Sequence, residues 1–226
     1  MTVAKLDALR GRFTGLIFVL LALSLLANAA PAGDLHTLVV DLAFSVLLLF
    51  AVRSVGPGLR ITAIVLATPA FLGHWALYMA NEAVPRRLVF FSSTAFLVFL
   101  TFVVIFAVLG DPVVTTDTVV GAICAYFLLA VTFGNAYALV EVLSPGSFLL
   151  TPALAADVHW SPPTSPITPV LQYFSFSTLT TLGFGDVTPL SRGARFLAVI
   201  EAIAGQLYLA ILIARLVGIH TSRSSS

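Results

Sequence analysis

The sequence contains few charged residues. Asp, Glu, Lys and Arg make up 9% of its 226 residues, whereas roughly a quarter is usual in soluble domains. A water-soluble domain of this length could not cover its surface with so few charges, so the composition excludes an ordinary soluble protein. The formal net charge is +1, which excludes the strongly basic field that proteins binding nucleic acid carry.

Cysteine is nearly absent as well. Cys124 is the only one, so no intrachain disulfide can form. It lies inside an apolar run, where we expect a buried, small apolar side chain. No His, Cys, Asp and Glu residues are grouped at the spacing of a zinc site. The polar groups also lack a base and nucleophile at a recognisable spacing, which makes an intramembrane enzyme the least favoured class.

Apolar residues, by contrast, account for 59% of the chain. A membrane-spanning helix needs about twenty mostly apolar residues in succession. Six stretches come close to that length and predict an all-α integral membrane protein with six transmembrane helices. The stretches are approximately residues 13–30, 35–52, 61–80, 88–109, 116–143 and 195–218.

Residues 1–30 allow a second interpretation. A basic start and an apolar core precede Ala27-Asn28-Ala29, as in a secretory signal peptide. The apolar core is longer than that of a typical signal, which favours a retained first span. Cleavage near residue 29 would leave the later spans in the same orientation.

The basic residues predict the orientation, because cytoplasmic loops are enriched in Lys and Arg. With the N-terminus inside, the external segments carry the smaller set, Arg86, Arg87, Arg192 and Arg195. The cytoplasmic segments carry Lys5, Arg10, Arg12, Arg53, Arg60, Arg215 and Arg223. We therefore expect a multi-pass protein of the cell (plasma or inner) membrane with both termini cytoplasmic.

The segment between the fifth and sixth spans differs from the rest. Residues 144–168 are rich in Pro and Ser and predict an irregular, exposed loop. Thr168 and Pro169 then form a good helix start signal. The helical run 170–179 is too short to span a membrane, so it predicts a re-entrant half-helix.

A glycine-bearing motif follows the half-helix directly. Residues Thr180 to Pro189 read TTLGFGDVTP, with Gly183 and Gly185 alternating with larger residues. Glycine reaches positive φ without a steric penalty, so this spacing lets several carbonyl oxygens turn toward one axis. The alternative is a chance glycine-rich connector, which the flanking half-helix and full span disfavour.

This motif resembles the selectivity filter of the tetrameric potassium-channel family, Thr-[Val/Ile/Leu]-Gly-[Tyr/Phe]-Gly-Asp. The resemblance covers about the last hundred residues and implies a homotetramer in the lipid bilayer that conducts K+ passively. It implies a degenerate, voltage-sensor-like four-span domain over residues 1–112, a pore domain over 113–220 and a short cytoplasmic tail over 221–226. It implies no enzyme activity and no cofactor other than K+ as permeant ligand. The near-zero net charge predicts no nucleic-acid partner, and we expect no soluble ligand-binding domain in this chain, because residues 220–226 are too few to form one.

The resemblance also assigns the filter residues. The filter comprises Thr181, Leu182, Gly183, Phe184 and Gly185, and the carbonyl oxygens of the first four bind dehydrated K+. The Thr181 hydroxyl closes the innermost site. Thr180 faces the cavity at the base of the half-helix, whose C-terminal partial negative charge stabilises a cation there. Asp186 lies at the external mouth.

Several positions around the expected filter depart from the family pattern or have an alternative role. Tyr173 and Phe174 stand where many members carry two aromatic residues that brace the filter, and their alternative role is ordinary packing. Phe184 replaces the commoner Tyr and so lacks a hydroxyl. Ser177 stands where some members carry Glu. These departures leave open a weakly selective monovalent cation channel of the same fold.

Two residues of the last span are further candidates. Glu201 lies within an apolar run, and an intramembrane carboxylate is a functional candidate. We hypothesise that it hydrogen-bonds the half-helix or the filter backbone from behind; the alternatives are contact with water in the outer vestibule or a structural contact. Gly205 matches the glycine at which the family's pore-lining helix bends, and close helix packing is its alternative role.

The fourth span lacks the charges that voltage sensing needs. Residues 88–109 contain no arginine, and Arg86 and Arg87 lie only at its start. We therefore expect no gating by a charged helix that moves in the field. A carrier or membrane scaffold in which the Gly motif is a broken helix remains the rival class, although carriers usually show paired interrupted segments and only one is visible here.

Overall fold

The computed structural model describes residues 15–16, 19–20, 42, 44–52, 58–80, 85–110, 115–157 and 168–224. Within these ranges the chain is predominantly helical. Two short strands accompany the helices. The elements are α4 (Arg60–Ala80), α5 (Arg86–Gly110), α6 (Thr116–Leu143), β1 (Phe148–Leu150), α7 (Pro152–Asp157), α8 (Thr168–Leu179), β2 (Val187–Pro189) and α9 (Arg192–Ser224).

Four of the described helices are long and apolar enough to cross a membrane. They are α4, α5, α6 and α9, which correspond to the third, fourth, fifth and sixth spans expected from the sequence. The first two expected spans, 13–30 and 35–52, lie largely outside the described residues. Their described parts, including residues 44–52, are helical.

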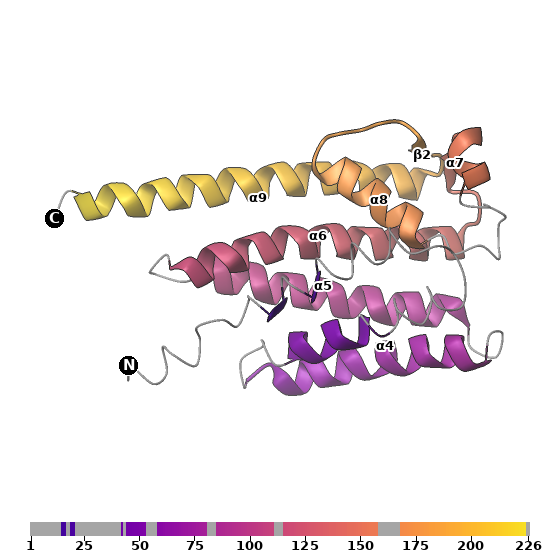
Figure 1. Ribbon diagram of the computed structural model, residues 1–226, viewed down its shortest axis with the longest axis horizontal. Coiled ribbons are helices and arrows are strands. Elements are labelled where there is room, and N and C mark those ends of the chain that lie inside the picture. The colour runs from indigo at the N-terminus through magenta and orange to yellow at the C-terminus, as the bar shows by residue number, and fades with distance from the viewer. Residues whose placement is uncertain are drawn as a thin grey trace.

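The long helices lie side by side in a layered bundle (Figure 1). α5 packs between α4 and α6, and α6 also contacts α8 and α9. The short helix α8 lies against the part of α9 that follows β2, and the C-terminal part of α9 extends beyond the other helices. α6 is thus the central element that connects α8 and α9 to the rest of the bundle.

The start of α6 is fixed by its own side chains. The Thr115 hydroxyl accepts a hydrogen bond from the Thr118 backbone N–H at 3.3 Å, and the Thr115 N–H donates to the Thr118 hydroxyl at 3.2 Å. This reciprocal capping satisfies two of the backbone donors that a helix N-terminus leaves unpaired. The helix therefore begins where the sequence predicts, at Thr116.

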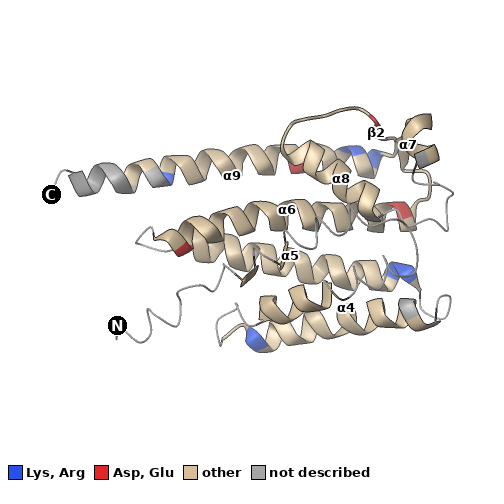
Figure 2. Ribbon diagram, in the orientation of Figure 1, with Lys and Arg blue, Asp and Glu red and all other residues tan. Residues whose placement is uncertain are grey.

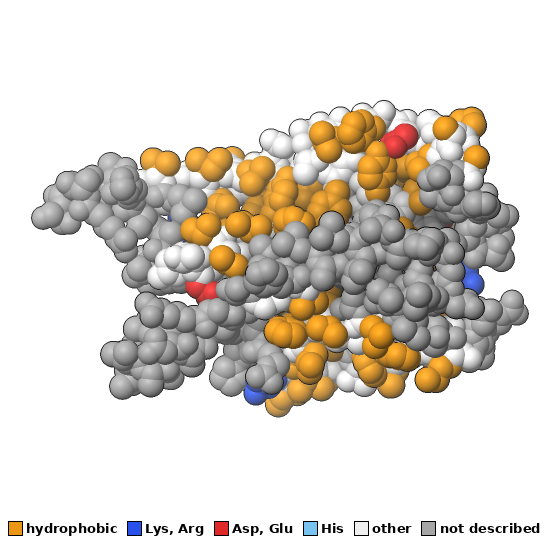
Figure 3. Space-filling model, in the orientation of Figure 1, with side chains coloured by type: hydrophobic (Ala, Val, Ile, Leu, Met, Phe, Trp, Pro, Cys, Tyr) orange, Lys and Arg blue, Asp and Glu red, His pale blue; other side chains and the backbone are white. Residues whose placement is uncertain are grey.

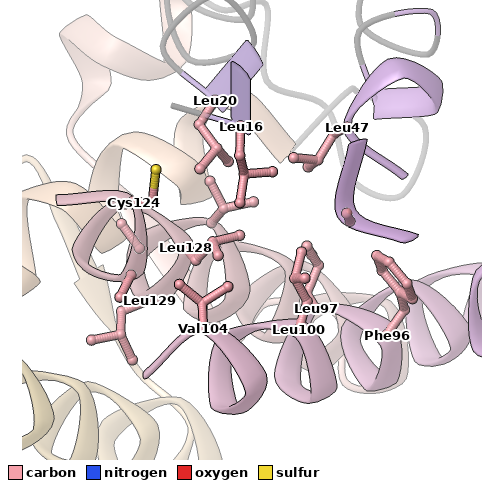
Figure 4. Packing of buried hydrophobic residues seen from close by; sticks show 14 of the residues in the cluster. Leu16, Leu20, Leu47, Phe96, Leu97, Leu100, Val104, Cys124, Leu128 and Leu129 are labelled. Atoms are coloured by element: carbon pink, nitrogen blue, oxygen red, sulfur yellow. The ribbon is translucent and has the colours of Figure 1, made fainter. Parts of the chain in front are cut away.

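The main apolar core lies between α5, α6 and the described N-terminal residues. Figure 4 shows leucines of the N-terminal region packed onto α5 and α6, and Cys124 is fully buried there, as expected. Many apolar side chains also face outward over the surface, as Figure 3 shows. An outward apolar surface suits lipid, where helices associate through close packing and hydrogen bonds rather than the hydrophobic effect. One such bond joins the Thr101 and Thr132 hydroxyls at 2.8 Å.

The segment after α6 is more regular than the sequence suggests. β1 pairs antiparallel with β2, with Phe148 opposite Pro189 and Leu150 opposite Val187, and α7 follows β1. The expectation of an irregular loop is therefore wrong for residues 148–157, whereas residues 158–167 lie outside the described part. The partner strand of β1 is formed by the last three residues of the glycine-bearing motif, and local sequence does not reveal such a distant pairing.

Candidate functional site

The half-helix α8 is held tightly against α6. The Gln172 side-chain N–H donates to the Ala130 carbonyl oxygen at 3.0 Å, and the Ser175 hydroxyl lies 2.7 Å from the same oxygen. A Cβ at Gly134 would lie 2.6 Å from Gln172 Oε1. The glycine therefore allows α6 and α8 to approach closely enough for these polar contacts.

The C-terminal end of α8 meets both α6 and α9. Leu179 is fully buried, and its carbonyl oxygen accepts a hydrogen bond from the Tyr126 hydroxyl at 3.1 Å. A Cβ at Gly205 would lie 2.7 Å from Leu179 Cδ1 and 3.0 Å from the Leu179 carbonyl oxygen. Gly205 thus provides the space in which α8 ends, and α9 is helical on both sides of it. Bending of α9 at Gly205 stays a prediction.

The backbone after α8 changes hand at every second residue. Thr181, Gly183 and Gly185 have φ values of 61°, 57° and 77°, and Thr181 is the only non-glycine with positive φ among the described residues. Residues with positive φ that alternate with residues of negative φ can turn successive carbonyl groups to the same side of a strand, whereas an extended strand alternates them. The sequence predicts this geometry at the two glycines. It gave no signal at Thr181, where the left-handed conformation costs about 1–2 kcal/mol.

The amide side of this strand is anchored to α8. The Leu182 N–H donates to the Ser177 carbonyl oxygen at 2.9 Å, and the Gly183 N–H approaches the same oxygen at 3.3 Å. The Gly183 N–H also lies 3.1 Å from the Ser177 hydroxyl oxygen. Ser177 is therefore the residue that holds the strand. From the sequence it was a candidate only because some members of the family carry Glu at this position.

The carbonyl side of the strand is left open. No other described residue donates a hydrogen bond to the carbonyl oxygens of residues 181–184. The Leu182 and Phe184 side chains are 62% and 66% exposed in the single chain. Carbonyl oxygens that no described donor occupies are suitable ligands for a dehydrated alkali cation. Figure 1 shows this strand as the arc between α8 and β2.

The lower end of the strand begins at Thr180. Its hydroxyl donates to the Phe176 carbonyl oxygen at 2.6 Å, and the residue is exposed. The Thr180 backbone N–H donates to the same Phe176 carbonyl oxygen at 3.0 Å, so the hydroxyl adds a second hydrogen bond at the C-terminal end of α8.

The outer end of the strand is tied to α8 by an aromatic residue. The Tyr173 hydroxyl donates to Asp186 Oδ2 at 2.7 Å, and the Tyr173 ring stacks on Phe184 with centroids 6.4 Å apart. Desolvation, followed by the hydrogen bond to Asp186, raises the pKa of Tyr173 to about 12. The phenol therefore keeps its proton and remains a donor throughout the neutral pH range.

Phe174 points to a different cluster. Its ring centroid lies 5.0 Å from that of Tyr137 and 5.6 Å from that of Phe148, and both pairs are edge to face. Aromatic pairs prefer this geometry to a face-to-face sandwich. Phe174 therefore joins α8 to α6 and β1, whereas Tyr173 alone of the two aromatics stacks on the strand's Phe184 ring.

The strand pair completes the outer end. The Thr151 N–H donates to the Asp186 carbonyl oxygen at 2.9 Å, and the Leu190 N–H donates to the Ser147 carbonyl oxygen at 2.7 Å. The Glu141 carboxylate in turn accepts the backbone N–H groups of Gly146 and Ser147, at 2.7 and 2.8 Å. Sequence reasoning missed these contacts, because those of Thr151 and Leu190 depend on the β1–β2 pairing and those of Glu141 depend on the turn that follows α6.

Glu201 is fully buried behind α8. Its Oε1 contacts the Ser175 hydroxyl, and its Oε2 accepts a hydrogen bond from the Tyr137 hydroxyl. Figure 2 shows the acidic position of α9 beside α8. The structure thus brings Glu201 to the half-helix, and it adds Tyr137 and Ser175, which no sequence signal distinguished from other hydroxyl-bearing residues.

Comparison with known proteins agrees with this geometry. Residues 158–221 match the model of a protein family described as ion channel. This part of the chain is an ion-channel domain, and the match supports assigning the protein to the potassium-channel family. That family is a class of non-enzymes that conduct ions across membranes. No curated protein and no solved structure matches the chain.

Proposed function

We propose that the protein is a potassium-selective channel that conducts dehydrated K+ passively through the strand Thr181–Gly185. The observation that supports this most is the two-sided strand, with amides held by Ser177 and carbonyl oxygens left open. Oxygens fixed on a supported backbone can replace the water shell of an ion. K+ is then the permeant ligand bound by Thr181, Leu182, Gly183 and Phe184, and no cofactor takes part.

The proposed active unit is a homotetramer. One chain supplies one strand, whereas a ring of carbonyl oxygens around an ion needs four. The exposed apolar surface of α9 supports contact with other copies or with lipid, and it includes Phe196, Val199, Ile203 and Leu207, each at least half exposed in the single chain. Chemical cross-linking of the protein in lipid should therefore give a ladder that ends at four chains.

We place the protein in the plasma or inner membrane of the cell. The proposed arrangement has six spans, with both termini in the cytoplasm. Residues 1–112 form the four-span domain, 113–220 the pore domain and 221–226 a short cytoplasmic tail. The basic residues favour this orientation, and it places Asp186 outside. Accessibility of single cysteines at positions 145 and 186 to an impermeant thiol reagent tests the orientation in a variant that lacks Cys124.

Phe184 favours one alternative, a weakly selective monovalent cation channel. Its ring stacks on Tyr173 but carries no hydroxyl to hydrogen-bond α8. The Tyr173 hydroxyl bonds Asp186 instead, which supports a rigid filter and therefore selectivity. A reversal potential measured across a Na+/K+ gradient separates the two functions: it follows the K+ equilibrium potential for the selective channel and lies near zero for the weakly selective one.

A further inference from the structure

The environment of Glu201 fixes how many hydrogens its cluster must contain. The Ser175 hydroxyl oxygen lies 2.7 Å from the Ala130 carbonyl oxygen, and it also contacts Glu201 Oε1. Two oxygen atoms within hydrogen-bonding distance of each other, as in both of these contacts, need a hydrogen between them, because their lone pairs otherwise repel. The cluster therefore needs one hydrogen on each side of the Ser175 oxygen.

Ser175 can supply only one of these two hydrogens. A hydroxyl carries one hydrogen, and a carbonyl oxygen carries none. If Ser175 donates to Ala130, the hydrogen between Ser175 and Oε1 must come from Glu201. The Tyr137 hydroxyl then donates to Oε2, so that three donors meet three acceptors.

The surrounding charges agree with a neutral acid. α8 contains no charged residue, and in α9 the basic residues nearest Glu201 in sequence, Arg192 and Arg195, lie at its outer start. On α6, Tyr126 is the further titratable group close enough to interact electrostatically with Glu201, whereas Glu141 is occupied by the loop after the helix. No described cation contacts Glu201, and an unpaired carboxylate inside a membrane is costly.

We propose that Glu201 is a protonated, neutral carboxylic acid that donates to Ser175 and positions the pore helix through this hydrogen-bond relay. Tyr137 and Ser175 are positioning residues of the same relay. It joins α9, α8 and α6 at a point two residues before Ser177, which holds the Leu182 and Gly183 amides. The relay therefore fixes the filter without placing a negative charge behind it. Its functional readout rests on the proposed channel activity.

Infrared spectroscopy of the full-length protein in lipid tests the protonation without any ion flux. The wild type should show the C=O stretch of a protonated carboxylic acid at neutral pH, and Glu201→Gln should remove that band. Asp186→Asn and Glu141→Gln are the matched controls and should retain it. A wild-type spectrum without the band, or a band that survives in Glu201→Gln, overturns the proposal.

Selectivity and the persistence of current test the positioning role. A glutamine can donate to Ser175 and accept from Tyr137, so Glu201→Gln should behave like the wild type. Tyr137→Phe should shorten the conducting state about threefold to tenfold, the factor that one lost hydrogen bond gives. Glu201→Leu removes two hydrogen bonds and should shorten it at least as much. Tyr208→Phe, which removes a buried hydroxyl bonded to Ala122, should have no such effect.

Two results contradict the relay. If Glu201→Gln is as damaging as Glu201→Leu, a charge rather than a donor is required, and the proposal is wrong. If Tyr137→Phe matches Tyr208→Phe in every readout, Tyr137 holds no positioning role.

If Glu201→Leu does not fold, the glutamine variant and the infrared spectra decide. If the wild type conducts no ions, the channel function fails while the infrared result still decides the relay.

Discussion

The Tyr173 hydroxyl donates to Asp186 Oδ2 at 2.7 Å, so α8 is bonded directly to the residue that follows the strand Thr181–Gly185. The same tyrosine stacks on Phe184 inside this proposed filter strand. Ser177, one turn further along α8, holds the amides at the lower part of the strand. The strand is thus fixed to α8 at both ends, and this arrangement leads to the following predictions.

Tyr173→Phe should destabilise the conducting filter while leaving the ring stacked on Phe184. The lost hydrogen bond corresponds to about 1 kcal/mol, or about a fivefold faster loss of current during maintained conduction. Patch recordings from reconstituted protein measure this rate. In an Asp186→Ala background, which lacks the acceptor, the same substitution should add less. An equal effect in both backgrounds means that the hydroxyl does not act through Asp186.

Bound K+ should raise the thermal stability of the assembled protein. Gly183→Ala and Gly185→Ala should abolish this increase. Both glycines have positive φ, 57° and 77°, which an alanine adopts only at a cost of about 1–2 kcal/mol. Neither has an atom within 4 Å of an added Cβ in the single chain, so the strain is conformational. Thermal unfolding with and without K+ measures the effect. The control is Gly193→Ala in the first turn of α9, which also has open space but no positive φ.

Gly205→Ala should reduce stability because of crowding. Its Cβ would lie 3.0 Å from the Leu179 carbonyl oxygen, which belongs to the backbone and cannot rotate away. Overpacking of this kind costs about 1–3 kcal/mol. Thermal unfolding of the assembled protein measures the loss. If stability is unchanged while open probability falls, Gly205 acts as a hinge and the packing explanation is wrong.

Conduction should depend only weakly on voltage. Each elementary charge that crosses the field contributes about 2.3 kcal/mol per 100 mV, and α5 carries charges only at its first two positions, Arg86 and Arg87. Current recorded in symmetric K+ without blockers should therefore give a shallow conductance–voltage curve. A steep curve under these conditions requires a voltage sensor that α5 does not provide.

The spans were predictable because apolar length and helix starts are local signals. α6 runs from Thr116 to Leu143, as the sequence predicts, because Thr115 and Thr118 cap its start. α9 continues beyond the predicted span 195–218 to Ser224. Hydropathy predicts which residues can lie in lipid, whereas a helix can continue past the membrane. The strands β1 and β2 were not predictable, because each has three residues and its partner lies on the far side of the filter.

The site was only partly readable from the sequence for a related reason. Two features could be recognised from the sequence. The glycine-bearing motif around Gly183 matches a family pattern, and Glu201 is a carboxylate within an apolar span. The left-handed Thr181 could not be recognised, because no local rule favours positive φ for a threonine. Tyr137 and Ser175 gained their roles only when α6, α8 and α9 came together around Glu201.

Ion flux into liposomes that contain the purified protein tests the central claim most directly. Uptake of K+ and Rb+ should be rapid and uptake of Na+ much slower, and Gly183→Ala should lower K+ uptake to the level of empty liposomes while Gly193→Ala leaves it unchanged. Equal uptake of all three ions, or K+ uptake that persists in Gly183→Ala, contradicts a filter made of backbone carbonyl oxygens.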